Sequence, residues 1–103
     1  MIAVKVILQA QPEKAQELEK LLKDIIPSVR HEQGTVTYTL HRSQKDASRF
    51  LFYEKYRDQQ ACDDHMSTPY VQELIKQLDQ FLMRAPEIEF FEEIDGFTRK
   101  EVY

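Results

Sequence analysis

Two ionisable side chains in the middle of the chain have types and positions that suit proton transfer. Glu54 lies in the apolar segment 49–56, between Phe52 and Tyr56 on the same side of a predicted strand. A carboxylate flanked by rings must find a hydrogen-bond donor or have its pKa raised. It could then serve as a general base or orient a histidine. A structural alternative stays open, in which Glu54 accepts bonds from helix N-termini or from a cross-strand Lys or Arg.

His65 is the second candidate, and it stands near the end of the acidic segment 59–66, directly after Asp63 and Asp64. An imidazole exchanges protons near neutral pH, which makes His65 a candidate catalytic base. At the end of a short helix, an imidazolium would equally complement the helix dipole. The position of His65 therefore leaves both a catalytic and a helix-capping role open.

Several tyrosines are candidates for lining a pocket beside these two groups, although a tyrosine near a sheet more often belongs to the core. They are Tyr38, Tyr53, Tyr56 and Tyr70. The three histidines stand on separate segments without metal-ligand spacing, and two glycines leave no Gly-rich loop for phosphates. Neither a metal nor a nucleotide cofactor is expected. Cys62 is interpreted as a packing side chain on a helix surface rather than as a nucleophile.

Composition limits the class of protein further. The 103 residues suit one domain over residues 1–103. The net charge of −4, without a Lys/Arg-rich run, argues against nucleic acid as a partner. No stretch approaches the about 18 apolar residues of a membrane span, and the N-terminus lacks signal-peptide features. With a single cysteine, a soluble cytoplasmic protein is the expectation.

The elements that would position the candidate residues follow from periodicity. Residues 2–9 are β-branched and aliphatic, which predicts a strand. Pro12 suits the start of a helix, which Pro27 should kink and Gly34 should cap. The apolar stripe of that helix has gaps of three and four residues and consists of Ala15, Leu18, Leu22, Ile25 and Val29.

A hairpin is predicted next. Residues 35–42 alternate, which places Val36, Tyr38 and Leu40 on one face, and residues 49–56 form the return strand after a polar turn.

The second helical region is predicted in two pieces, followed by a last strand over residues 87–94. Asp58 is expected to cap a short helix over residues 59–66, and Thr68 with Pro69 to begin a longer one that Ala85–Pro86 ends. The apolar stripe of the longer helix consists of Val71, Leu74, Ile75, Leu78, Phe81 and Leu82.

The order β-α-β-β-α-β predicts a ferredoxin-like α+β sandwich with the helices on one face of an antiparallel sheet. The first strand is apolar on both sides, with Val4 on one and Ile7 on the other. The last strand likewise has Phe90 and Phe91 on opposite sides. In a sheet with one solvent-exposed face, apolar and polar residues should alternate more regularly along each strand. We therefore expect a homodimer with face-to-face sheets, in which the apolar tail 96–103 reaches the partner.

One combination of these features resembles a known family. The segment Glu54-Lys55-Tyr56, a short helix closing on His65, and then Thr68-Pro69-Tyr70 resembles the antibiotic biosynthesis monooxygenase family of small dimeric α/β-barrel proteins. Residues 25–38 are similar to that family's first helix running into its second strand. The similarity spans essentially the whole chain.

The resemblance implies a cofactor-independent monooxygenase, nearest to the branch that acts on quinols and polycyclic phenols. A base would remove a phenolic proton, and the resulting anion would reduce O₂ in a dry pocket. The resemblance assigns His65 as the base or the phenol orienter, with Glu54 behind it. It places Tyr38, Tyr53 and Tyr70 around the substrate oxygens.

Departures from the family pattern narrow this expectation. Tyr56 stands where many members have Trp, and Tyr70 where many have His. Ile7, His65 and Ile75 stand near the positions where the haem-degrading branch uses Asn, Trp and His, so haem degradation is not expected. A non-catalytic dimeric ligand-binding or accessory protein, or a small-molecule isomerase, remains the alternative. An enclosed apolar cavity containing the His65 imidazole and a tyrosine hydroxyl would favour the oxygenase.

Overall fold

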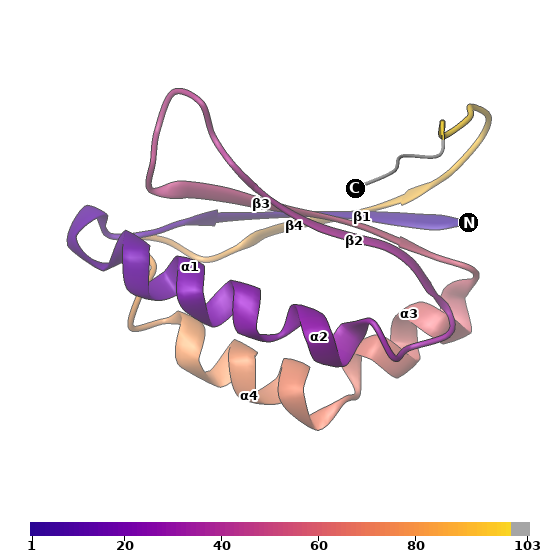
Figure 1. Ribbon diagram of the computed structural model, residues 1–103, viewed down its shortest axis with the longest axis horizontal. Helices are drawn as coiled ribbons and strands as arrows, with labels where there is room; N and C mark the ends of the chain where they lie inside the picture. Colours follow the sequence, from indigo (N-terminus) through magenta and orange to yellow (C-terminus); the bar gives the residue numbers. More distant parts are fainter. Residues whose placement is uncertain (100–103) are drawn as a thin grey trace.

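The computed structural model describes residues 1–99 as a four-stranded antiparallel sheet covered on one face by helices (Figure 1). The strands are β1 (Ile2–Gln9), β2 (Thr35–Arg42), β3 (Arg49–Tyr56) and β4 (Glu87–Glu92), in the order β2-β3-β1-β4. The helices are η1 (Pro12–Lys14), α1 (Ala15–Asp24), α2 (Ile26–Val29), α3 (Gln59–Met66) and α4 (Pro69–Leu78). The predicted ferredoxin-like α+β fold is confirmed.

The core lies between the sheet and the helices. The predicted stripe of the first helix, which consists of Ala15, Leu18, Leu22, Ile25 and Val29, is buried throughout. The helix is interrupted at Ile25, close to Pro27, because proline has no N–H to donate within the helix. None of the helices within residues 1–99 is long and apolar enough to cross a membrane.

Both predicted helix caps are confirmed. The Asp58 carboxylate accepts a hydrogen bond from the Ala61 amide at 2.9 Å at the start of α3. The Thr68 hydroxyl accepts from the Val71 amide at 3.4 Å at the start of α4, and Pro69 is the first residue of that helix. These bonds satisfy amide groups that have no partner within their own helix.

Gly34 has a different role from the predicted one. The helical segment ends at Val29, and Gly34 lies in the turn before β2 without a positive φ, so it does not cap the helix. A Cβ atom built on Gly34 would lie 2.4 Å from the Cβ atom of Ala61 in α3. Glycine is required here because the turn and α3 approach each other closely.

Strand β2 has an irregularity near its start that the alternating pattern does not predict. Thr35 pairs with Tyr56 and Thr37 with Lys55, so Val36 is the extra residue of a β-bulge. Its side chain is 51% exposed, whereas Tyr38 farther along β2 is packed against the core.

Two elements end earlier than predicted. Helix α4 ends at Leu78, and Phe81 and Leu82 belong to a following segment that is held to the end of β1. Gln11 donates its amide hydrogen to the Phe81 carbonyl at 2.8 Å, which ties the chain to β1 instead of extending the helix. Strand β4 ends at Glu92, so Ile94 lies beyond it and is almost fully exposed.

Candidate active site

A cavity of about 350 Å³ lies between the sheet and helices α3 and α4, and we call it the inner cavity. Its apolar lining includes Val4, Val6, Phe52, Val71, Leu74 and Leu78. Ile75 of α4 and Ile88 and Phe90 of β4 also line it and are about half exposed. The inner cavity therefore opens to solvent between α4 and β4, and its lining is buried farther in.

Strand register places the polar groups at the closed end. Tyr38, Glu54, Val4 and Phe90 are successive cross-strand neighbours on the helix-facing side of the sheet. Tyr38 and Glu54 stand at one end of this row and Phe90 at the other. A ligand that entered from the mouth would meet apolar side chains first and polar groups last.

His65 of α3 lines the inner cavity and is only 3% exposed. Its Nδ1 atom lies 2.9 and 3.1 Å from the two carboxylate oxygens of Glu32. A carboxylate can only accept, so Nδ1 carries the proton, and in the neutral ring the lone pair is on Nε2. Nε2 has no hydrogen-bond partner within residues 1–99. This geometry leaves one ring nitrogen available as a proton acceptor.

Glu32, in the turn before β2, gathers three hydrogen-bond donors. Besides His65, the Tyr70 hydroxyl donates to one carboxylate oxygen, and the Thr35 hydroxyl donates to the other at 2.7 Å. Burial, together with the bond to Glu32, raises the pKa of Tyr70 to about 12. Glu32 is not among the residues predicted from the sequence, because it stands in an irregular polar segment 33 positions from His65. No local pattern marks such a residue.

Glu54 is 6% exposed and has one hydrogen bond, from the Tyr56 hydroxyl to Oε1. Burial raises the pKa of the Glu54 carboxyl, although the bond from Tyr56 and the nearby His65 ring oppose this. The expected place of Glu54 behind His65 is taken by Glu32. The alternative expectation, a bond from a helix N-terminus or from a Lys or Arg, is not met either, because the donor is Tyr56.

Two of the four candidate tyrosines have their rings packed next to the His65 ring. The Tyr38 ring lines the inner cavity, with its centroid 4.7 Å from that of Phe52 and 5.3 Å from that of His65. The Tyr38 hydroxyl has no hydrogen-bond partner within residues 1–99, and burial raises its pKa. The Tyr56 ring is also 5.3 Å from His65, but it is fully buried behind Glu54 and does not line the cavity.

The other two candidates lie elsewhere. The Tyr70 hydroxyl donates a hydrogen bond to Glu32, and Tyr70 is not part of the cavity lining. Tyr53 follows Phe52 on β3, so the alternation of the strand turns it to the opposite face of the sheet, where it is 39% exposed. The expectation that Tyr53 lines the same pocket as His65 is therefore corrected.

Cys62 also lines the cavity, yet it is not an activated nucleophile. It is buried beside Val4 and Tyr56 rather than on a helix surface, and burial raises the pKa of its thiol. Within residues 1–99 there is no group of three His, Cys, Asp or Glu side chains that could hold a metal ion.

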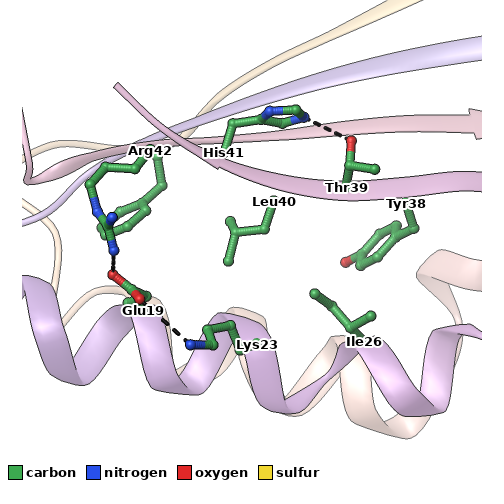
Figure 2. A pocket seen from close by; sticks show the side chains of 9 residues that line it. Glu19, Lys23, Ile26, Tyr38, Thr39, Leu40, His41 and Arg42 are labelled. Atoms are coloured by element: carbon green, nitrogen blue, oxygen red, sulfur yellow. Dashed lines mark hydrogen bonds and ion pairs between the residues drawn. The ribbon is translucent and has the colours of Figure 1, made fainter. Parts of the chain in front are cut away.

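A second and larger hollow of about 430 Å³ lies between α1 and β2, and we call it the outer hollow (Figure 2). Its charged side chains bind one another: Glu19 pairs with Arg42 and with Lys23. Thr39 and His41 border the hollow from β2, but their side chains point away from α1 (Figure 2). Tyr38 borders both spaces. The inner cavity is the better candidate because its polar groups keep unused hydrogen-bonding capacity.

Comparison with known sequences identifies relatives. Residues 1–77 match the sequence model of a family described as "Antibiotic biosynthesis monooxygenase". A Synechocystis protein is 29% identical over 84 residues, which cover 82% of this chain and 57% of that protein. A Mycobacterium tuberculosis protein with the name "Putative monooxygenase" is 29% identical over 83 residues, which cover 81% of each chain.

Solved structures agree with the fold. The structure of the M. tuberculosis protein superimposes with a TM-score of 0.89 at 25% identity, covering 94% of this chain and 98% of that one. A Caulobacter crescentus protein described as a "putative antibiotic biosynthesis monooxygenase" gives a TM-score of 0.85 at 29% identity. The match covers 91% of this chain and 90% of that one.

Proposed function

The chain belongs to the antibiotic biosynthesis monooxygenase family, and from that premise we propose that it oxidises a small aromatic quinol or phenol with O₂ and without a cofactor. The observation that carries the proposal is the His65 imidazole beside the apolar inner cavity. Its Nδ1 atom is hydrogen-bonded to Glu32, and its Nε2 atom has no hydrogen bond in the part of the chain that the structure describes. A cavity with a buried base and a tyrosine is the arrangement that favours an oxygenase over a protein that only binds its ligand.

In the proposed reaction, a quinol and O₂ give a hydroxyquinone and water. His65 Nε2 takes the phenolic proton, and the electron-rich anion transfers electrons to O₂ as a C–O bond forms at a ring carbon. The ring carbon then loses its hydrogen as a proton, and the O–O bond breaks. One oxygen atom stays on the ring, and the other leaves as water with the proton that His65 returns. All four electrons that reduce O₂ come from the substrate.

Each neighbouring group has a defined part in this reaction. Glu32 would keep the proton on Nδ1 and stabilise the imidazolium that forms when Nε2 accepts the phenolic proton. Tyr38 would donate a hydrogen bond to a substrate oxygen. The apolar lining, which includes Val6, Phe52 and Val71, would exclude water from the anion and from the reduced oxygen.

We propose as well that two copies pair through the face of the sheet that the helices leave bare (Figure 1). Ile7, Leu51, Tyr53 and Phe91 lie on that face and are partly exposed. Apolar side chains on an open sheet face favour coverage by a partner. In the tail, Phe97 is largely exposed, whereas Val102 and Tyr103 lie outside the described residues. Sedimentation equilibrium should show twice the chain mass of 12.3 kDa, and a monomer would contradict the pairing.

Oxygen uptake with reduced menadione tests the proposed function. We compare the wild type, His65→Gln and the autoxidation blank, with His41→Gln, an exposed histidine of β2 outside the inner cavity, as the matched control. His65→Gln should lower the rate above blank by about 100-fold or more, as the loss of a general base does, while His41→Gln should leave it unchanged. Circular dichroism and melting establish that both variants are folded. Equal rates in wild type and folded His65→Gln would contradict the role of His65.

A further inference from the structure

Glu54 is a buried carboxyl group of the inner cavity to which the proposed reaction assigns no task. It stands on the floor of the cavity, between Tyr38 of β2 and Val4 of β1 in the cross-strand row. Within residues 1–99 no Lys or Arg forms an ion pair with it. A carboxylate so deeply buried without a cation would carry a large desolvation penalty, which the neutral acid avoids.

The hydrogen bond from Tyr56 determines which oxygen remains available. The Tyr56 hydroxyl donates to Oε1, so that oxygen acts as an acceptor. Oε2 has no hydrogen bond within residues 1–99, and it is not sealed from the cavity as an unsatisfied buried atom. In the neutral acid, Oε2 carries the proton and can donate it to a molecule in the cavity.

Within residues 1–99, no neighbouring group forms a hydrogen bond with Glu54 Oε2. Tyr56 already donates to Glu54, and Cys62 is a weak acceptor. Tyr38 faces Glu54 from β2, while His65 from α3 binds Glu32 through Nδ1. The inner cavity therefore offers an acceptor at His65 Nε2 and a donor at Glu54 Oε2.

We propose that Glu54, as a neutral carboxylic acid, donates a hydrogen bond to a second oxygen of the ligand, so that the site selects aromatics with two oxygens, a hydroxyl for His65 and an acceptor for Glu54. This rests on the proposed function in taking a quinol as the substrate. The same donor would hold that second oxygen in the quinol and in the quinone that forms from it. A monophenol would leave the buried Glu54 donor without a partner, which costs binding free energy.

Binding of menadione, the oxidised quinone, tests this without requiring turnover. Glu54→Gln retains a neutral donor in the same place, and Glu54→Met is an unbranched side chain without one. Titration calorimetry should give a Kd for Glu54→Gln within about twofold of the wild type. For Glu54→Met the Kd should be about tenfold weaker, the size expected for one lost hydrogen bond. Melting of each variant shows that the fold is intact.

The pH dependence of binding separates a neutral donor from a charged one. Wild-type affinity should fall as the pH rises and Glu54 ionises, whereas Glu54→Gln should lack this fall. Any contribution from Tyr38, Tyr56, Cys62, His65 or Glu32 is common to both proteins and cancels in their ratio. In infrared difference spectra, a protonated-carboxyl C=O band should shift on menadione binding in the wild type and be absent from Glu54→Gln.

Two results would overturn the proposal. If Glu54→Gln binds as weakly as Glu54→Met, the site needs the carboxylate. If Glu54→Met binds as well as the wild type, Glu54 does not touch the ligand. Oxygen uptake reports separately on the proposed function: menadione binding as described with no uptake above blank would contradict the oxygenase and leave the role of Glu54 standing.

Discussion

The inner cavity and the outer hollow differ most in how far the hydrogen-bonding capacity of their polar side chains is already used. In the outer hollow, the Glu19 carboxylate pairs with Arg42 and with Lys23 (Figure 2). In the inner cavity, His65 and Glu54 are nearly inaccessible, yet each has only part of its hydrogen-bonding capacity used.

This difference indicates which of the two spaces is better suited to binding and proton transfer. Exposed charges that pair in water contribute little and offer a ligand little, because solvent competes for them. Burying a base beside a carboxylate costs folding free energy when one of its ring nitrogens has no hydrogen bond. In the low dielectric of the interior, that nitrogen interacts strongly with a bound ligand.

After the loss of His65 itself, the largest effect should come from removing the charge that supports it. Glu32→Gln keeps an acceptor for Nδ1 but removes the charge that stabilises the imidazolium, and we expect oxygenase activity to fall about 10–100-fold. The loss should lie in kcat with KM nearly unchanged, because Glu32 does not touch the substrate. Steady-state oxygen uptake measures both constants.

Glu19→Gln is the matched control, since it removes a carboxylate that pairs in the outer hollow. Its kcat should equal that of the wild type. A loss as large as that of Glu32→Gln would show that the two spaces do not differ in function.

The next effect concerns stability. Burial raises the pKa of Glu54, so between the unfolded value of about 4.3 and the higher folded one the native state binds more protons than the unfolded chain. The free energy of unfolding of the wild type should therefore fall, relative to Glu54→Gln, as the pH rises through this window, and stay constant above it. Each pKa unit between the folded and the unfolded value changes the free energy of unfolding by about 1.4 kcal/mol. Urea denaturation of both proteins across the window measures this, and parallel pH curves would contradict it.

The smallest effect should come from Tyr38, which borders both spaces. Tyr38→Phe removes one hydroxyl that is unbonded within residues 1–99, and one hydrogen bond to a substrate should change kcat/KM by about three- to tenfold. Tyr53→Phe alters the opposite face of the sheet and should leave kcat/KM unchanged. A Tyr53 effect as large as the Tyr38 effect would mean that the substrate also contacts the bare face.

Much of the fold could be predicted because its signals are local. Asp58 and Thr68 cap helices by reaching amides three residues ahead, and α3 begins and ends where the sequence predicts. Glu54 between two rings could be recognised as a perturbed carboxyl from its strand neighbours alone. The bulge at Val36 and the early end of α4 could not be recognised, because both depend on pairing with β3 or β1.

The sequence alone decides which segments form helices and strands, and which side chains share a face, since periodicity and capping act over a few residues. Assembly of the sheet with its helices is what brings His65 to Glu32, 33 positions away. It also decides that Gly34 is needed for the approach of α3. Contacts of this kind depend on the order and register of strands, and register is a property of the assembled sheet rather than of any one segment.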